Sequence, residues 1–316
     1  MLFELKQIQS EFFQVLTKKG RSHNTIKNYR TDIECFNKFL ASQNKNYDIK
    51  NFTLKETNLY GRYLEEKYPS DNSRRRRLQA LRMFFDFLVE KEVLDTNPVR
   101  EIPTSPKFLD IPRPTPFIDI KLLWTHLISL KGKTPIEKLL IKRNQLVTLL
   151  IFGSGLKVSE LAKLKTSHIM EGKDGVRVMV IHDKRDPYTI PLPEIFNTIY
   201  TDYIELLEVQ KAKSNHTFDE LLFNANPYKI LSGGLSPRGV EIVLKELREK
   251  LEIILTPKSL RQACIFKWLT MKLPDSQIKE WLGVAPSYSL GIYREHLENN
   301  LYGETFLKEL YEHYKV

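Results

Sequence analysis

The sequence predicts a mainly α-helical protein of two domains, the second of which holds a small antiparallel β-sheet. Three observations support this prediction. Apolar residues recur at helical spacing along most of the 316 residues, as they do in amphipathic helices. A proline-dense stretch at residues 103–116 interrupts this pattern. Two short runs rich in β-branched residues, 176–181 and 188–193, are the candidate strands.

The first domain, residues 1–102, is predicted to be helical throughout. Its Ser22 precedes an apolar repeat at helical spacing, and serine commonly caps a helix by accepting from a backbone N–H group. Asn97 and Pro98 mark its end. The predicted helices cover residues 2–16, a run that starts near Ser22, residues 54–67 and residues 70–89.

Four consecutive arginines, residues 74–77, open the last of these helices. They cannot all share one helical face, so some must point away from the apolar core. A solvated charged face is one interpretation. We favour phosphate binding, because a helix N-terminus and clustered guanidinium groups both attract anions. The candidate phosphate contacts of this domain are Lys27, Arg30, Arg74, Arg75, Arg76 and Arg77.

Charge and composition narrow the class of partner. The chain has 49 Lys and Arg against 39 Asp and Glu, a formal net charge of +10, which favours a polyanionic partner such as a nucleic acid. No apolar run approaches the roughly 20 residues that span a bilayer, and no cleavable leader opens the chain, so we expect a cytoplasmic protein without a membrane partner. Cys35 and Cys264 are too isolated for a disulfide framework or a zinc site, and both are expected in the core.

Residues 103–118 are predicted to be a proline-rich linker, and residues 119–316 the second domain. Repeated proline removes backbone donors and favours an extended chain. In the second domain, an apolar stripe in the tail between Leu297 and Val316 predicts a C-terminal helix. Further helices are predicted at residues 121–130, 136–153, 194–211, 237–251 and 256–268, and up to Gly283.

Three motifs of the second domain carry a resemblance to a known family. Residues 153–164 read GSGLKVSELAKL, residues 256–261 read TPKSLR, and Leu-Gly-Val at 282–284 is followed by Tyr293. They are similar to the T-G-L-R-x-S-E-L-x-x-L segment, the His-x-x-Arg helix start and the Leu-Gly-His motif, with its following tyrosine, of tyrosine recombinases (integrases). The chain therefore resembles this family, in particular its Xer-like members, and the run after Ser22 resembles the start of their core-binding domains.

The resemblance assigns roles position by position. Tyr293 matches the nucleophile, and Arg261 matches an arginine that clamps the scissile phosphate. The turn between the two predicted strands carries the family's proton donor to the leaving 5′ oxygen; Lys184 is the first choice for it and Arg185 the second. An exposed basic turn without a catalytic role is the alternative. Two further candidate DNA contacts are Arg185 in this turn and Arg238 at a Ser-Pro-Arg helix start.

Three positions depart from the family pattern. Lys157 replaces an arginine, Lys258 replaces the usual histidine, and Val284 replaces a histidine or tryptophan that donates a hydrogen bond. Lysine keeps the charge but loses the two-pronged guanidinium, and valine donates nothing. Because one lost donor costs about 10²-fold to 10³-fold in rate, we expect impaired catalysis. The indole of Trp281 is a candidate substitute for the missing donor.

The resemblance also implies the architecture and the reaction. It implies a C-shaped clamp around double-stranded DNA, made of a helical core-binding (SAM-like) domain and a catalytic domain, and a reaction through a 3′-phosphotyrosyl intermediate without metal or cofactor. It implies dimers and tetramers on DNA through the C-terminal helix, alone or beside a related active recombinase. A catalytically inactive DNA-binding structural or regulatory protein is the second hypothesis, and a topoisomerase-like nicking enzyme the third.

Overall fold

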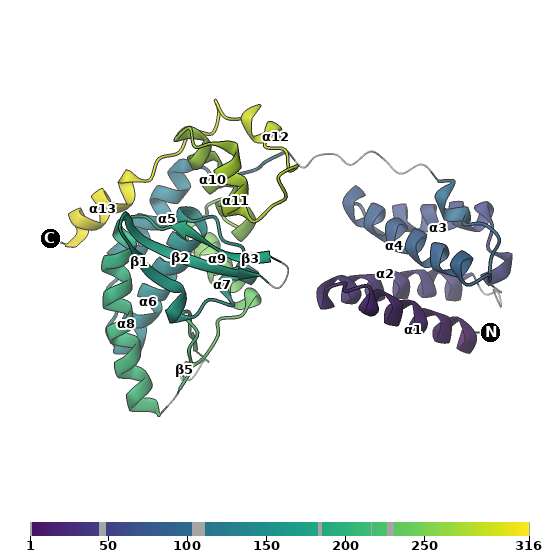
Figure 1. The fold of residues 1–316 in the computed structure, drawn as a ribbon, viewed down its shortest axis with the longest axis horizontal. Helices are drawn as coiled ribbons and strands as arrows, with labels where there is room; N and C mark the ends of the chain where they lie inside the picture. The colour runs from purple at the N-terminus through teal and green to yellow at the C-terminus, as the bar shows by residue number, and fades with distance from the viewer. Residues whose placement is uncertain are drawn as a thin grey trace. The chain divides into compact units, whose positions relative to one another are not determined.

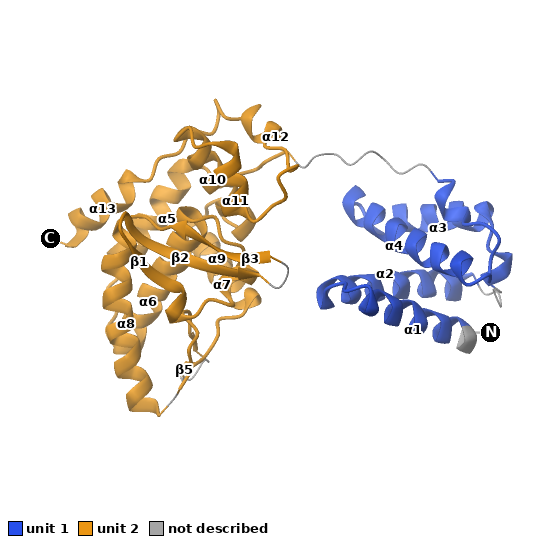
Figure 2. Ribbon diagram, in the orientation of Figure 1, with its two compact units in different colours: residues 1–108 blue, residues 109–316 orange. Residues whose placement is uncertain are grey.

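The structure, a computed structural model, describes residues 2–43, 49–102, 111–182, 185–215, 217–225 and 231–315. The chain divides into two compact units, residues 1–108 and 109–316 (Figure 2). The division falls inside the stretch 103–118 that we expected to be a linker. Each unit has its own apolar core, as chains of this length usually do.

Unit 1 is a bundle of four helices (Figure 1). Ser22 caps the second helix by accepting from the backbone N–H of Thr25 at 3.2 Å. The core is unusually aromatic, with Phe36, Tyr60 and Phe85 fully buried and packed edge to face. The helices are α1 (Leu2–Lys18), α2 (His23–Ser42), α3 (Leu54–Lys67) and α4 (Asp71–Glu90), with 3₁₀ turns at Ile49–Asn51 and Pro98–Arg100.

Unit 2 combines helices with a three-stranded antiparallel sheet of order β1-β2-β3 (Figure 1). Its first half contains α5 (Phe117–Ser129), α6 (Pro135–Thr148), a π-helical turn (Leu149–Gly153), α7 (Val158–Leu161), a 3₁₀ turn (Thr166–His168), β1 (Ile169–Gly172), β2 (Gly175–His182) and β3 (Arg185–Pro191). Its second half contains α8 (Ile195–Ser214), β4 (Asn224–Ala225), β5 (Leu231–Ser232), α9 (Pro237–Leu251), α10 (Pro257–Thr270), α11 (Asp275–Leu282), α12 (Gly291–Arg294) and α13 (Thr305–Lys315).

The two longer strands of the sheet are those that the β-branched runs predicted. Val178 on β2 pairs with Ile169 on β1 and with Ile190 on β3, and Val178 and Ile190 are fully buried. The register shifts between Val180 and His182, next to the turn into β3. The prediction of a mainly helical protein with a small antiparallel sheet is confirmed. Strand β1 was not predicted, because its four residues are too few to show a period.

The end of the proline-rich stretch belongs to unit 2. The backbone N–H of Thr115 donates to the carbonyl of Ser259 at 3.1 Å, and the two side-chain hydroxyls lie 2.8 Å apart. The hydroxyl of Tyr302 donates to the Thr115 carbonyl at 2.8 Å. These bonds fasten residues 111–116 to the first turn of α10, while residues 103–110 lie outside the described residues.

The C-terminal helix α13 packs on its own unit, against α5 and α8. Its apolar face buries Phe306, Leu307 and Tyr311, and the indole N–H of Trp124 donates to the Leu307 carbonyl at 2.9 Å. Both cysteines are buried, as expected. None of the helices in the described ranges is long and apolar enough to cross a membrane.

Candidate active site

Arg261 is the residue that joins the three motifs of unit 2. It lies on α10, whose first turn is capped by Thr256 accepting from the Ser259 backbone N–H at 3.0 Å. Its Nε donates to the carbonyl of Gly155 at 2.5 Å, and one terminal nitrogen donates to the carbonyl of Leu282 at 3.1 Å. A guanidinium has five N–H donors. Donors therefore remain for a phosphate after Arg261 has fixed both neighbouring segments.

Two glycines of the motifs allow this close approach. Gly155 has φ +66°, and a Cβ there would lie 2.7 Å from the ring of Trp268. Gly283 has φ +64° and ends α11, and a Cβ there would lie 2.9 Å from the Tyr188 hydroxyl. Both conformations are costly for any residue with a side chain. The glycines thus explain why the loop and the helix end can meet at Arg261.

Lys157 stands at the start of α7 beside a buried carboxylate. Glu160, with its side chain only 6% exposed, accepts from the Lys157 backbone N–H at 2.7 Å and from Lys157 Nζ at 3.2 Å. The carboxylate oxygen that Lys157 Nζ contacts, Oε1, also lies 3.1 Å from Nε2 of the imidazole of His182. Lys157, Glu160 and His182 therefore form one charged cluster that links α7 to the end of β2.

Tyr188 connects this cluster to Arg261. Its ring stacks on that of His182 at 6.1 Å and 15°, and the guanidinium of Arg185 lies 3.6 Å from its ring centre. Burial, with a contribution from Glu160, raises the pKa of Tyr188 to about 12, while the charges of Arg185 and Arg261 oppose this rise. The Tyr188 hydroxyl is buried and has no hydrogen-bond partner among the described residues.

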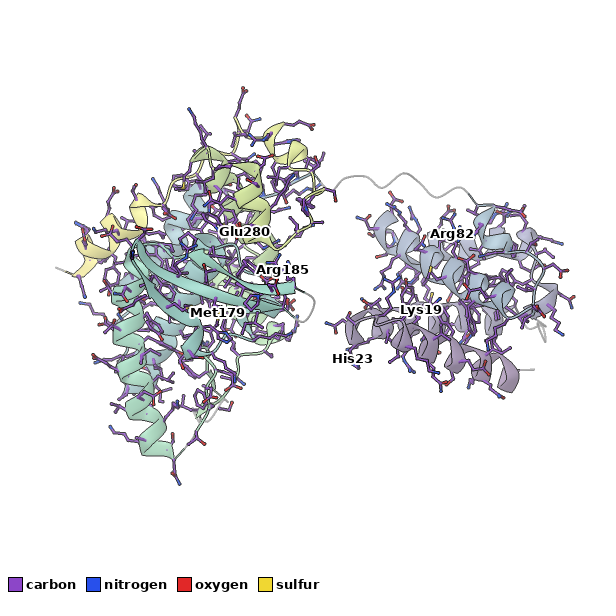
Figure 3. All side chains as sticks on the ribbon, viewed as in Figure 1. Lys19, His23, Arg82, Met179, Arg185 and Glu280 are labelled. Atoms are coloured by element: carbon purple, nitrogen blue, oxygen red, sulfur yellow. The ribbon has the colours of Figure 1, made fainter. Side chains whose placement is uncertain are left out.

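The side chain of Arg185 extends from β3 towards the end of α11. A terminal nitrogen donates to the Glu280 carbonyl at 3.5 Å (Figure 3). Lys184, the first choice for the proton donor, lies outside the described residues, as does Asp183. Arg185 thus lies beside Tyr188 and the end of α11.

Tyr293 lies on the short helix α12 and is close to Arg261. Its ring packs edge to face on Phe266 at 5.5 Å, and the residue is 7% exposed. Burial, with Tyr288, raises the pKa of Tyr293 to about 12, and a hydrogen bond from Gln262 and the charge of Arg261 lower it. The buried phenol is therefore neutral at pH 7.

The other departures from the family pattern differ in their exposure. Lys258 is exposed on the first turn of α10. Val284 directly follows Gly283 and packs against the core of unit 2. The indole of Trp281 is buried and packs on Trp268 at 5.2 Å. Trp281 therefore serves the core, and we do not assign it the role of the missing donor.

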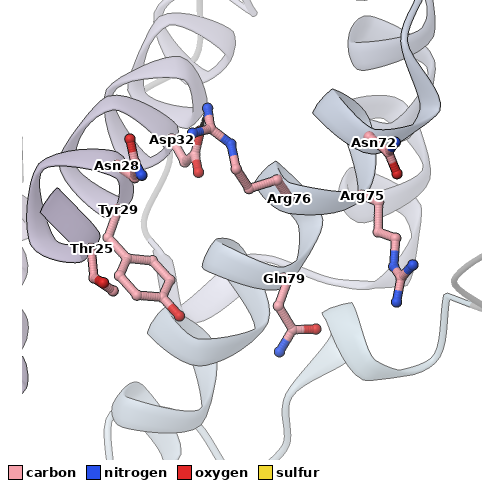
Figure 4. A pocket seen from close by; sticks show the side chains of 8 residues that line it. All are labelled: Thr25, Asn28, Tyr29, Asp32, Asn72, Arg75, Arg76 and Gln79. Atoms are coloured by element: carbon pink, nitrogen blue, oxygen red, sulfur yellow. Dashed lines mark hydrogen bonds and ion pairs between the residues drawn. The ribbon is translucent and has the colours of Figure 1, made fainter. Parts of the chain in front are cut away.

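Of the four consecutive arginines at residues 74–77, two line a cleft and one is buried. A cleft of about 430 Å³ lies between α2 and α4 (Figure 4). Arg75 and Arg76 line it, and Arg76 bonds at 2.8 Å to Asp32, which is buried. Arg77 is buried instead, with its guanidinium 3.6 Å from the ring centre of Tyr68. The cleft is lined by Thr25, Asn28, Tyr29, Asp32, Asn72, Arg75, Arg76 and Gln79.

Among the remaining candidate DNA contacts, Arg74, Arg30 and Arg238 have local partners. Arg74 pairs with Asp71 on the same turn of α4. Arg30 is exposed and lies 4.6 Å from the ring centre of Phe13, and Lys27 is exposed on α2. Arg238 is exposed at the start of α9 and pairs with Glu241 at 3.0 Å. Arg77 is the member of the set that burial removes from the surface.

Three residues of this site, Glu160, His182 and Tyr188, were not predicted as functional candidates. Glu160 had a visible signal, since it follows Lys157 by three residues, the spacing at which a carboxylate reaches back to a helix start. His182 and Tyr188 had a weaker signal. They flank the turn between the strands, and only the register of β2 and β3 brings their rings together.

Comparison with known families covers both units. Residues 133–300 match the Phage integrase family, and residues 10–92 match the Phage integrase, N-terminal SAM-like domain. The first match spans more than half of the chain and includes Lys157, Arg261 and Tyr293. The chain belongs to the phage integrase family. The resemblance read from the motifs is confirmed.

Relatives of this integrase-family chain include Xer recombinases. It is 25% identical over 306 residues to tyrosine recombinase XerC of Oceanobacillus iheyensis, covering 94% of this chain and 93% of the relative. It is 24% identical over 283 residues to tyrosine recombinase XerD of Listeria innocua, covering 88% and 90%.

Solved structures show the same fold. A lambda integrase (75–356) dimer bound to a COC′ core site matches with a TM-score of 0.64 at 16% identity, covering 92% of this chain and 94% of that one. The Tn1549 transposon integrase (aa 82–397) in complex with circular intermediate DNA matches with a TM-score of 0.62 at 13% identity, covering 97% and 98%. A lambda integrase tetramer bound to a Holliday junction matches with a TM-score of 0.64 at 16% identity, covering 92% and 76%.

Proposed function

We propose that this chain is a Xer-like site-specific recombinase that cleaves and rejoins duplex DNA through a 3′-phosphotyrosyl intermediate, with a slow cleavage step. The observation that carries the proposal is the position of Arg261. Its guanidinium ties the loop of Lys157 to the end of α11, and its charge acts on the phenol of Tyr293. Three motifs far apart in the sequence thus meet at one phosphate-binding side chain.

The reaction uses this arrangement directly. The oxygen of Tyr293 attacks the DNA phosphorus, and the leaving strand departs with a 5′-hydroxyl. Negative charge grows on the phosphate oxygens as the five-coordinate state forms, so fixed cationic donors lower the barrier. Arg261 supplies a planar donor that is already in place, and Lys157 supplies a second positive charge.

Three features support a slow step. Lys157 shares its charge with Glu160 and lacks a two-pronged donor. Val284 donates nothing where the family pattern has a donor. Tyr293 is buried with a pKa of about 12, so its uncovering adds to the barrier. One missing preorganised donor costs roughly 10²-fold to 10³-fold in rate.

We propose that unit 1 is the core-binding domain and that the two domains hold a duplex as a clamp. Arg75 and Arg76 at the cleft, with the exposed Lys27 and Arg30, supply phosphate contacts on α2 and α4. Such contacts position a protein on DNA and account for most of its salt dependence.

We also propose that copies of this chain assemble on DNA through α13. Lambda integrase, which has the same fold, was crystallised on DNA as a dimer and as a tetramer, and this supports the proposal. The apolar face of α13 rests on α5 and α8 of its own unit. An identical helix from a neighbouring copy fits the same surface, so exchange needs no new contacts.

The test begins with DNA recovered by pull-down of the tagged chain from a genomic library. Duplexes from the enriched site, each carrying a nick near a different phosphate, trap any covalent adduct because the short cleaved strand diffuses away. We expect an adduct with the wild-type chain and none with Tyr293→Phe. Failure of the wild-type chain to form an adduct at any nick position refutes strand cleavage.

Val284 and the buried Tyr293 favour a second candidate function, a DNA-binding protein of this family that does not cleave. Under this second function, the wild-type chain binds its DNA site sequence-specifically but forms no covalent protein–DNA adduct. The double variant Lys157→Arg with Val284→His restores two donors of the family pattern. If the double variant forms the adduct and the wild-type chain does not, the residues at positions 157 and 284 are the cause of the lost cleavage.

A further inference from the structure

One face of α10 holds two parts of unit 2 that are far apart in the sequence. Ser259, Gln262 and Phe266 follow one another at helical spacing on this face, and all three are buried. Residues three and four apart lie on the same side of a helix. The end of the proline-rich stretch contacts Ser259 and Gln262, and the ring of Tyr293 packs on Phe266.

The proline-rich segment is attached to this face by its backbone as well as by a hydroxyl. The side-chain hydroxyls of Thr115 and Ser259 lie 2.8 Å apart. The backbone N–H of Arg113 donates to Oε1 of Gln262 at 3.1 Å. Arg113 itself is exposed, so its backbone rather than its side chain makes the attachment to α10.

The bond from Arg113 decides which end of the Gln262 amide faces the nucleophile. A backbone N–H can only donate, so the end of the side-chain amide that faces it is the oxygen. The other end is the NH₂ group, which donates to the phenol of Tyr293. The reversed amide would place two donors against each other at Arg113, so the network excludes it.

The phenol of Tyr293 has a second partner, Tyr288, in the loop before α12. A hydrogen bond that stabilises a neutral phenol raises its pKa, and one that stabilises the phenolate lowers it. The bond with Tyr288 raises the pKa of Tyr293, and the bond with Gln262 lowers it. The phenol therefore donates towards Tyr288, which is 38% exposed, and accepts from Gln262, which is 7% exposed.

We propose that Gln262, anchored by the backbone of Arg113, activates the nucleophile by donating to the Tyr293 oxygen and stabilising its phenolate form. The inference rests on the proposed strand cleavage for its role in the reaction. As the phenol gives its proton to water, the N–H of Gln262 already points at the oxygen that becomes negative. A donor that is fixed at its far end needs no reorientation when that charge forms.

The first test measures the ionisation of Tyr293 by itself. A tyrosine with fluorine on its ring, placed at position 293 of the full chain by nonsense suppression, reports its ionisation through its ¹⁹F NMR signal. Ring fluorine also makes the phenol more acidic, so that it titrates while the protein is folded. The charged and titratable groups that act on this phenol are Arg261 on α10 and Tyr288 in the loop before α12.

We expect the fluorinated phenol to ionise at higher pH in Gln262→Met than in the wild-type chain, because methionine has a similar length and no donor. Loss of the fold would expose the phenol and act in the opposite direction. Tyr288→Phe is the control of sign, and in it the phenol should ionise at lower pH. The inference is overturned if Gln262→Met titrates as the wild-type chain does, or if Tyr288→Phe does not lower the pH of ionisation.

Arg113→Pro and Arg113→Ala form a matched pair for the anchor. Both remove the same side chain, but only proline removes the backbone N–H. Because position 113 lies between Pro112 and Pro114, a further proline suits the chain there. We expect the phenol to ionise at higher pH in Arg113→Pro and at the wild-type pH in Arg113→Ala. Identical titrations of these two variants contradict the anchoring of Gln262 by Arg113.

The second test measures adduct formation on the nicked duplexes. Hydrogen bonds to charged groups are stronger than neutral ones, so we expect Gln262→Met to slow adduct formation by about 10-fold to 10²-fold at an unchanged affinity for the duplex. With the fluorinated residue at position 293, at a pH where it is ionised in both chains, Gln262→Met should react as fast as the wild-type chain.

Two results of the second test contradict activation by Gln262. One is a Gln262→Met variant that is as fast as the wild-type chain with ordinary tyrosine, and the other is a variant that stays equally slow once the phenol is ionised. A wild-type chain that forms no adduct refutes strand cleavage instead. The ¹⁹F titration needs no cleavage, so it still decides whether Gln262 stabilises the phenolate of Tyr293.

Discussion

Replacing Glu304 with glutamine is expected to destabilise unit 2, because it leaves a buried lysine without its carboxylate. Lys267 on α10 is 1% exposed and donates to the Gly153 carbonyl at 2.8 Å. Its ammonium also pairs with Glu304, which stands just before α13. Removing one partner of a buried pair leaves an uncompensated charge in a medium that solvates it poorly.

The magnitude follows from the exposure of the two partners. Breaking a fully buried pair costs about 3–5 kcal/mol. Glu304 is 32% exposed, and glutamine keeps a carbonyl oxygen for the lysine, so we expect ~2–3 kcal/mol. For a domain the size of unit 2, this loss lowers Tm by roughly 5–10 °C.

Tryptophan fluorescence during urea unfolding reads out unit 2 within the full chain, since Trp124, Trp268 and Trp281 all lie in it. Glu298→Gln, at an exposed position in the same tail, is the control and should change stability by less than ~0.5 kcal/mol. A Glu304→Gln variant as stable as that control would refute the argument.

Three further predictions concern single side chains. Tyr188→Phe removes a buried hydroxyl without a partner among the described residues and should leave urea stability unchanged or raised, whereas Tyr203→Phe breaks a buried 2.6 Å bond and should cost about 1–2 kcal/mol. Burial raises the pKa of Asp32, so its contribution to stability is present at low pH and is lost as pH rises above about 3.8. Asp32→Asn should therefore flatten the pH dependence of hydrogen exchange in α2. Gly155→Ala forces a Cβ to 2.7 Å from Trp268 at φ +66° and should cost more than ~2 kcal/mol by urea unfolding.

Local pattern was enough to predict the helices and the two longer strands. Their apolar periods persist over many residues, and Ser22 and Thr256 supply caps at helix starts. The spacing of the motifs also predicted that Arg261 and Tyr293 meet, because the resemblance supplied the fold that joins them. The four residues of β1 gave no comparable signal.

Contacts between distant segments could not be read from the same pattern. The run of four arginines has no internal feature that separates Arg76, which faces Asp32, from Arg77, which stacks on Tyr68. That division depends on which side of α4 the other helices cover. Likewise, the sequence pattern does not predict that Lys157 and His182 share a partner. The fold brings both side chains to the carboxylate of Glu160.

Helix α10 connects the candidate active site around Arg261 to the C-terminal tail. Arg261 holds the carbonyl of Gly155, and Lys267, on the same helix, holds the carbonyl of Gly153 two residues earlier in the loop that carries Lys157. Because Lys267 is also the partner of Glu304, loss of the tail removes a counter-charge directly beneath that loop. A tail exchanged between copies must bring an equivalent carboxylate to Lys267. Identical chains satisfy this requirement, since each copy carries the same sequence before α13.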